Sequence, residues 1–142
     1  MGPDSHGARG VNAPRVGCGA AIVRDGRLLL VKRVKPPEAG AWSLPGGKVD
    51  FLERVEDAIR REILEETGLA IRLVRPLRLV EMLGEAGQHW VLPVWLAEAE
   101  GEAENREPEK AEALGWFSLG APPNPLSQAA REAIAELAGG VN

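Results

Sequence analysis

A cluster of carboxylates on one predicted helix constrains this chain more than any other feature. Residues 54–67 carry apolar side chains at helical spacing, about 100° per residue, and Gly68 follows as a C-cap. Glu62, Glu65 and Glu66 lie three and four residues apart, so they share one sector with aliphatic residues of the same helix. A solvated acidic helix would separate the two kinds of side chain. The pattern therefore predicts that the three carboxylates face inward.

Carboxylates at this spacing repel one another, and the repulsion grows when they are desolvated. We therefore expect a cation among them. Oxygen-only ligands favour Mg²⁺, with Mn²⁺ as the alternative metal, over zinc. The ordinary alternative is a solvated helix face whose glutamates pair with neighbouring arginines, and it stays open on these residues alone.

The wider pattern from Gly47 to Leu69 resembles the Nudix box. Gly47 is followed after five residues by Glu53, after seven more by Arg61-Glu62, and then by Glu65-Glu66 and Gly68-Leu69. Further similarity to the family covers roughly residues 16–137. It is carried by three segments, which are Gly19 to Arg33, Trp42 to Gly47, and Glu107-Pro108-Glu109-Lys110 followed by Trp116-Phe117. The resemblance implies a Nudix-type α/β/α sandwich that hydrolyses a nucleoside diphosphate linked to a further group.

The resemblance also implies roles for individual residues. Phosphoanhydride hydrolysis needs charge neutralised on the phosphoryl oxygens and a water molecule placed in line. Glu62 is the first choice for the base that accepts the water's proton, and Glu66 for the principal metal ligand. The helical angle of Arg61 suggests that it holds Glu53 by an ion pair. The implied catalytic set is Glu53, Arg61 and Glu62, and the implied metal ligands are Gly47, Glu62, Glu65, Glu66 and Glu109.

A loop carboxylate is common in the family, and Glu109 or Glu112 could supply it, although a solvated loop charge is the favoured interpretation of either residue. For the substrate, phosphate contact by Arg33 is weighed against a solvated strand end. Stacking of a base on Trp42, Trp90, Trp116 or His89 is weighed against a place in the core. The implied substrate-binding residues are Arg33, Trp42, Gly46, His89 and Trp90.

The order of the predicted elements indicates the fold class. A hairpin turns at Asp25-Gly26, Ser127 caps the last helix, and Pro93 implies a sheet edge or a bulge. The expected elements are strands at 16–23, 28–32, 71–81, 89–97 and 112–117, helices at 54–67 and 127–138, and an exposed acidic loop at 98–109. This order predicts an α/β fold with a mixed sheet between helices.

Length and charge limit the function further. The 142 residues suit one domain, which we place at 14–142 behind a loose, Gly-rich tail at 1–13. A net charge of −4 argues against a nucleic-acid or anionic membrane partner and leaves a small nucleotide as the expected one. Cys18 is the only cysteine, and the tail has no signal-peptide core, so a cytoplasmic location is expected. A homodimer, common among relatives, is left open.

The resemblance points to a nucleoside triphosphate as the substrate. ADP-ribose pyrophosphatases of the family tend to carry a proline about sixteen residues after the box, where this chain has Glu85. Dinucleoside polyphosphate hydrolases tend to carry a tyrosine just beyond, and the chain has no tyrosine. We therefore expect hydrolysis of an NTP or dNTP to the monophosphate and pyrophosphate. The alternatives are an ADP-ribose or nucleotide-sugar pyrophosphatase and a non-catalytic nucleotide sensor; hydrolysis of RNA 5′ ends is disfavoured by the acidic balance.

Overall fold

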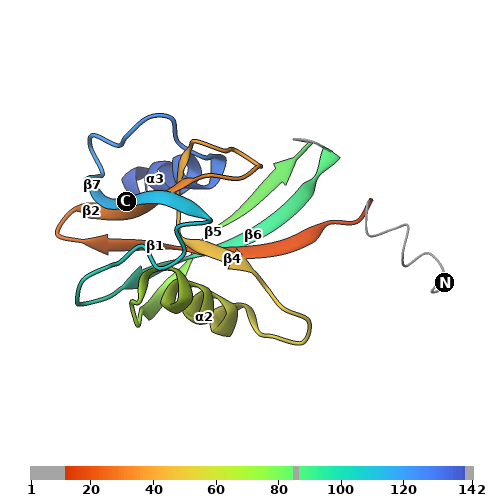
Figure 1. Ribbon diagram of the computed structural model, residues 1–142, viewed down its shortest axis with the longest axis horizontal. Coiled ribbons are helices and arrows are strands. Elements are labelled where there is room, and N and C mark those ends of the chain that lie inside the picture. Colours follow the sequence, from red (N-terminus) through yellow and green to blue (C-terminus); the bar gives the residue numbers. More distant parts are fainter. Residues whose placement is uncertain (1–11, 85–86, 140–142) are drawn as a thin grey trace.

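The computed structural model describes residues 12–84 and 87–139. A mixed β-sheet forms the middle layer, with one helix on each face (Figure 1). The elements are β1 (Arg15–Arg24), β2 (Arg27–Arg33), β3 (Trp42–Ser43), β4 (Gly46–Lys48), α2 (Val55–Thr67), β5 (Arg72–Leu83), β6 (His89–Glu98), β7 (Ala111–Ser118) and α3 (Gln128–Gly139). The predicted α/β sandwich is confirmed.

Strand β1 organises the sheet because it pairs with three other strands. It runs antiparallel to β2 and β4 and parallel to β6, while β5 pairs with β6 and β7 with β2. The β1–β4 ladder joins Cys18 to Gly47 and Gly19 to Gly46. This pairing holds Gly46 and Gly47 in β4, next to α2 (Figure 1).

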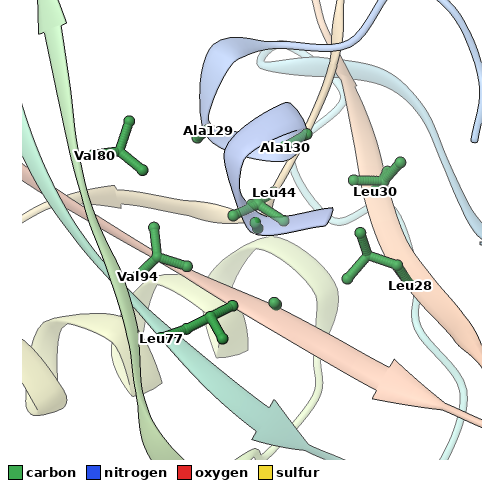
Figure 2. Packing of buried hydrophobic residues seen from close by; sticks show 10 residues of the cluster. Leu28, Leu30, Leu44, Leu77, Val80, Val94, Ala129 and Ala130 are labelled. Carbon is green, nitrogen blue, oxygen red and sulfur yellow. The ribbon is translucent and has the colours of Figure 1, made fainter. Parts of the chain in front are cut away.

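Two apolar clusters fill the spaces between the sheet and its helices. Along β1, Ala20 and Ile22 pack against α2, whereas Ala21 packs in the cluster of α3. This alternation follows from the two-residue period of a strand whose faces are both covered. Figure 2 shows Ala129 and Ala130 of α3 beside aliphatic side chains of the sheet. Both helices are therefore held by burial of small and aliphatic residues.

The two predicted helices begin and end close to the expected positions. Helix α2 has Arg54 at its N-cap and ends at Gly68, whose φ of 81° is the left-handed conformation that glycine adopts readily. Helix α3 follows Ser127, whose Oγ accepts a hydrogen bond from the Ala130 N–H at 3.1 Å. Both predicted caps, Gly68 and Ser127, are confirmed.

Some expectations about the sheet need correction. Strand β6, with Pro93, is an inner strand between β1 and β5, so the predicted edge position is wrong. The β1–β6 ladder is interrupted between Val91 and Val94, where Pro93 has no N–H to donate. The short strands β3 and β4 were not predicted, because two or three residues carry no periodicity.

Parts of two predictions lie outside the described residues. These are residues 1–11 of the proposed tail and residues 140–142 at the end of the proposed domain, within which residues 85 and 86 also lie outside the described part. Within the described part of the chain, no helix has the length and apolar character needed to span a membrane.

Candidate active site

A cavity of about 640 Å³ opens where β1, β4 and α2 meet and continues over β5 and β6. One part of its lining is charged and includes Glu62 and Glu66 of α2 together with Lys48 and Lys110. Another part is apolar and includes Leu92. The cavity therefore combines a polar end with space for an apolar or aromatic group.

Glu62 lies against the backbone of β4. Its residue exposure is only 9%, and a Cβ placed on Gly47 would meet the Glu62 carboxylate at 2.2 to 2.6 Å. No side chain fits in that space, so glycine at position 47 is what lets the carboxylate approach the strand. The Arg61 Nη1 donates a hydrogen bond to Glu62 Oε2 at 3.0 Å and orients the group.

Glu66 is the most deeply buried carboxylate of the site, with 7% residue exposure. Its Oε1 accepts a hydrogen bond from the Gly46 N–H at 3.0 Å. Burial raises the pKa of Glu66 from its ordinary 4.5 to about 7; the Gly46 bond opposes the shift, and the charges of Glu107 and Glu62 add to it. Two carboxylates on adjacent turns thus share a poorly solvated space.

Arg61 links these groups to the loop before α2. It donates to Glu53 Oε2 at 2.8 Å and Oε1 at 2.9 Å, and to the Lys48 carbonyl at 3.1 Å. The hydrogen bonds from Arg61 lower the pKa of Glu53 to about 2. The predicted ion pair of Arg61 with Glu53 is confirmed, and the same guanidinium reaches Glu62, so Arg61 positions two carboxylates at once.

The expectation that all three glutamates of the helix face inward is wrong for Glu65. Its side chain is 49% exposed, and its Oε1 lies 3.3 Å from the Arg61 Nη1. Around the helix axis Glu66 lies about 40° to one side of Glu62 and Glu65 about 60° to the other side, and the Gly46 N–H of β4 contacts the Glu66 side. The position of β4 selects Glu66.

The carboxylates of the site resemble the donor set of a hydrated divalent cation more than that of a metal held by protein ligands alone. Among residues 12–84 and 87–139, no group of three or more His, Cys, Asp or Glu side chains is close enough to hold a metal ion. Mg²⁺, however, commonly takes one or two carboxylates and completes its shell with water and phosphate oxygens. Glu62 and Glu66 are hard oxygen donors that share a buried space, and the raised pKa of Glu66 reflects this burial first and the neighbouring charges of Glu107 and Glu62 second. These residues fit a hydrated Mg²⁺ or Mn²⁺.

The loop that approaches the site contributes a residue that the sequence did not single out. The Arg106 N–H donates to the Glu66 carbonyl at 3.0 Å, which docks the loop on the end of α2. Glu107 then lies close enough for its charge to raise the pKa of Glu66, and it pairs with Lys110 at 3.5 Å. Nothing in the motif distinguishes Glu107 from its neighbours, because the distinction depends on this docking contact.

Glu109 and Glu112, the residues expected as the loop carboxylate, do not lie beside Glu66. Glu109 is exposed and does not contribute to the cavity lining. Glu112 pairs with Lys32 at 3.3 Å. Burial lowers the pKa of the Lys110 ammonium, but the charges of Glu107, Glu62 and Glu66 outweigh it and raise that pKa above its ordinary value.

The five residues expected to bind substrate are distributed unevenly. Gly46 and Trp90 line the cavity. Arg33 lines it too, but its Nε donates to the Pro37 carbonyl at 2.7 Å, so the guanidinium also organises the loop that follows β2. Trp42 packs edge-on against Phe117 with ring centroids 4.8 Å apart, and His89 lies outside the lining. The structure brings Gly46, Arg33 and Trp90 to one cavity and leaves the other two outside it.

Comparison with known proteins identifies the family. The family model described as NUDIX domain matches residues 13–137, so the chain belongs to the Nudix family. Residues 13–137 include the complete box, helix α2 and most of helix α3.

Individual relatives support this assignment. The chain is similar to the crystal structure of a MutT NUDIX hydrolase from Burkholderia pseudomallei, with a TM-score of 0.85 and 54% identity over 88% of this chain and 98% of that one. An ADP-ribose pyrophosphatase of Methanocaldococcus jannaschii is 48% identical over 39% of this chain and 33% of its own length. An oxidized purine nucleoside triphosphate hydrolase of Danio rerio is 39% identical over 45% of this chain and 42% of its own. The matches thus span well under half of these two curated relatives.

Proposed function

We propose that this protein is a Mg²⁺-dependent hydrolase of nucleoside triphosphates or deoxynucleoside triphosphates, releasing the monophosphate and pyrophosphate. The observation that carries the proposal is the pair of buried carboxylates, Glu62 and Glu66, held against Gly46 and Gly47 at the polar end of a cavity. Nucleotide-hydrolysing names among the similar proteins support the same class of substrate.

Glu62 and Glu66, with backbone oxygen from the Gly46-Gly47 segment, would hold the cation, and Mn²⁺ could replace Mg²⁺. When bound, the metal ion neutralises charge on the phosphate oxygens. Glu65 and Glu109 are less suited to ligation because both are exposed. Glu107 is the better candidate for a loop carboxylate, since its charge acts on Glu66.

The chain's own groups would carry the remaining steps. Glu62 accepts a proton from the attacking water as its oxygen bonds to phosphorus and the bridging P–O bond breaks, so pyrophosphate leaves. Arg61 keeps the Glu62 carboxylate in place, and Glu53 in turn holds Arg61. Lys110, Lys48 and Arg33 line the same cavity and supply positive charge for phosphate oxygens. Arg61 and Glu53 are positioning residues in this scheme.

The test is a hydrolysis screen of the purified protein with Mg²⁺ over NTPs, dNTPs, ADP-ribose and nucleotide sugars, with the products identified. We expect pyrophosphate and a nucleoside monophosphate from a triphosphate. Release of AMP and ribose 5-phosphate from ADP-ribose would instead favour the second candidate, which the similarity to the M. jannaschii enzyme supports. Tight nucleotide binding without any product would favour the non-catalytic sensor. A cytoplasmic location and a homodimer remain predictions.

A further inference from the structure

The cavity has a second end, away from the carboxylates, whose polar chemistry the proposed reaction does not use. Met82, Gln88, Trp90 and Leu92 line it. We infer that Gln88 and Trp90 recognise the nucleobase, and that Gln88 selects bases presenting a carbonyl oxygen, such as guanine, uracil and thymine, over bases presenting an amino group. This inference rests on the proposed function, because it assumes that a nucleotide occupies the cavity.

The two ends are joined across Gly17 of β1. A Cβ placed on Gly17 would lie 3.2 Å from the Gly47 carbonyl oxygen and 3.5 Å from Cε3 of the Trp90 indole. The glycine pair beside the carboxylates and the indole therefore border the same small residue. A nucleotide with its phosphates over Gly47 can reach Trp90 with its base because no side chain at position 17 stands between them.

Trp90 supplies a flat apolar surface at this end. It is half-buried in β6, opposite Met82 of β5 and Arg15 of β1. The Arg15 guanidinium lies 5.6 Å from the centroid of the indole and restrains the ring. Stacking on such a ring stabilises any base and does not choose among bases. Selection has to come from a polar neighbour.

Gln88 is that neighbour, and its orientation follows from the chemistry of tryptophan. The Trp90 Nε1–H donates to the Gln88 side chain at 2.9 Å. An indole nitrogen can only donate, so the atom facing it must be the amide oxygen of Gln88. The amide nitrogen therefore points away from the ring. Among the described residues, no hydrogen bond from that nitrogen is formed, and Gln88 lines the cavity.

An amide NH₂ held in this way offers two donors and no acceptor. Guanine O6 and the O4 of uracil or thymine accept such bonds, whereas the exocyclic amino groups of adenine and cytosine are donors themselves. An amino base would leave donors facing donors, which removes a hydrogen bond and leaves polar groups unpaired. For a half-buried contact we expect about a tenfold preference for carbonyl bases in kcat/KM.

The test compares dGTP, dTTP, dATP and dCTP with the full-length protein and three variants. Gln88→Glu keeps an oxygen for the Trp90 N–H but turns the second position into an acceptor, so the preference should invert toward dATP and dCTP. Gln88→Met should bring the four substrates within about twofold of one another. The matched control is Gln128→Met, which removes the chain's other glutamine, a residue outside the cavity lining, and should leave the preference unchanged.

Binding of the same nucleotides without metal, measured by calorimetry, separates this inference from the proposed function. A carbonyl-base preference in affinity that depends on Gln88 supports the inference even if no nucleotide is hydrolysed, a result that would overturn only the proposed function. Equal affinities for the four nucleotides, or a preference that survives in Gln88→Glu and Gln88→Met, would overturn the inference even if hydrolysis is fast.

Discussion

Helices α2 and α3 each carry two glutamates four residues apart beside an arginine, yet of these two pairs it is the one in α2 that lines the 640 Å³ cavity. In α3, Arg78 of β5 contacts Glu132 at 2.6 Å and Glu136 at 3.5 Å, with all three side chains partly exposed. In α2, Glu62 and Glu66 are nearly inaccessible, and the contacts of Arg61 include Glu62 but not Glu66. The same residue types thus form an ion-paired surface cluster on α3, and on α2 a buried pair of carboxylates of which Arg61 contacts one.

The shifts in pKa express the same difference. Burial is the largest single influence on Glu132 and raises its pKa, but the hydrogen bonds from Arg78 and Gln128 and the charges of Arg78 and Arg131 together outweigh burial and bring the pKa below its ordinary value. The pKa of Glu66 moves the other way, to about 7, because burial dominates. A carboxylate pair therefore indicates a cation site when one of its members is buried and forms no ion pair among the described residues, as is the case for Glu66, and spacing alone does not distinguish the two cases.

Replacing one glutamate in each helix by glutamine, which has the same size but carries no charge, tests the comparison most directly. Glu62→Gln should lower Mg²⁺-dependent turnover by about 10²- to 10⁴-fold, because an amide cannot accept the water's proton. Glu132→Gln, the matched change in α3, should leave turnover within about twofold. Steady-state kinetics with circular dichroism as a folding control measures both. Retained activity in Glu62→Gln would remove Glu62 from the role of general base.

The Glu62 carboxylate of α2 lies close to the backbone of β4 at Gly47. Adding one methyl group at position 47 should abolish this close contact. In Gly47→Ala the new Cβ would overlap the Glu62 carboxylate and displace it. Since a shift of about 1 Å at a reacting group can cost about 10²-fold, we expect a loss of that size in kcat. Gly120→Ala is the control, because its Cβ would meet nothing closer than 3.9 Å. Equal activity of the two variants would show that Glu62 does not need its observed position.

Glu66 and Glu132 should also respond oppositely to pH. In the metal-free protein the folded state binds the Glu66 proton more tightly than the unfolded state does. The stabilisation is therefore complete below pH 4.5 and is lost as pH rises through 7, by about 3 kcal/mol at most. Glu132 contributes in the opposite sense: its stabilisation is present above its ordinary pKa and is lost as pH falls.

Urea unfolding at pH 5 and pH 8 in the presence of EDTA measures this difference. Glu66→Gln should flatten the decline in the free energy of unfolding relative to the unaltered protein, whereas Glu132→Gln should not. Mg²⁺ should stabilise the unaltered protein more at pH 8 than at pH 5, because protons compete for the same carboxylate at the lower pH. An identical pH dependence in Glu66→Gln and the unaltered protein would contradict the assigned shift.

The sequence predicted those parts of this arrangement that depend on local spacing. Helical periodicity correctly placed Glu62 and Glu66 with the buried Ile63, and the offset of Arg61 correctly paired it with Glu53. Periodicity could not choose between Glu65 and Glu66, because that choice depends on where β4 passes the helix.

Contacts between distant segments account for the other differences. Glu107 reaches the site only because the loop docks on the end of α2, and Trp42 is drawn into the core by Phe117, 75 positions further along the chain. From the sequence, Trp90 and Trp42 are equally plausible as stacking residues. The folded sheet places Trp90 in the cavity lining and Trp42 against Phe117. Such contacts are set by tertiary packing, which overrides what a local pattern can specify.

The starts of the two helices differ as well, and this gives the smallest expected effect. Ser127 accepts from the Ala130 N–H and donates to Ser43 Oγ at 2.9 Å, whereas Arg54 at the start of α2 makes no side-chain cap. Ser127→Ala should therefore cost about 1–2 kcal/mol of unfolding free energy, and Arg54→Ser should gain about 0.5–1 kcal/mol by supplying an acceptor to the first turn. Chemical denaturation resolves both. If Arg54→Ser does not raise the free energy of unfolding, the contacts of Arg61 with Glu53 and Lys48 already hold the first turn of α2. In that case Arg54→Ser should raise the free energy of unfolding when it is introduced into the Arg61→Ala variant.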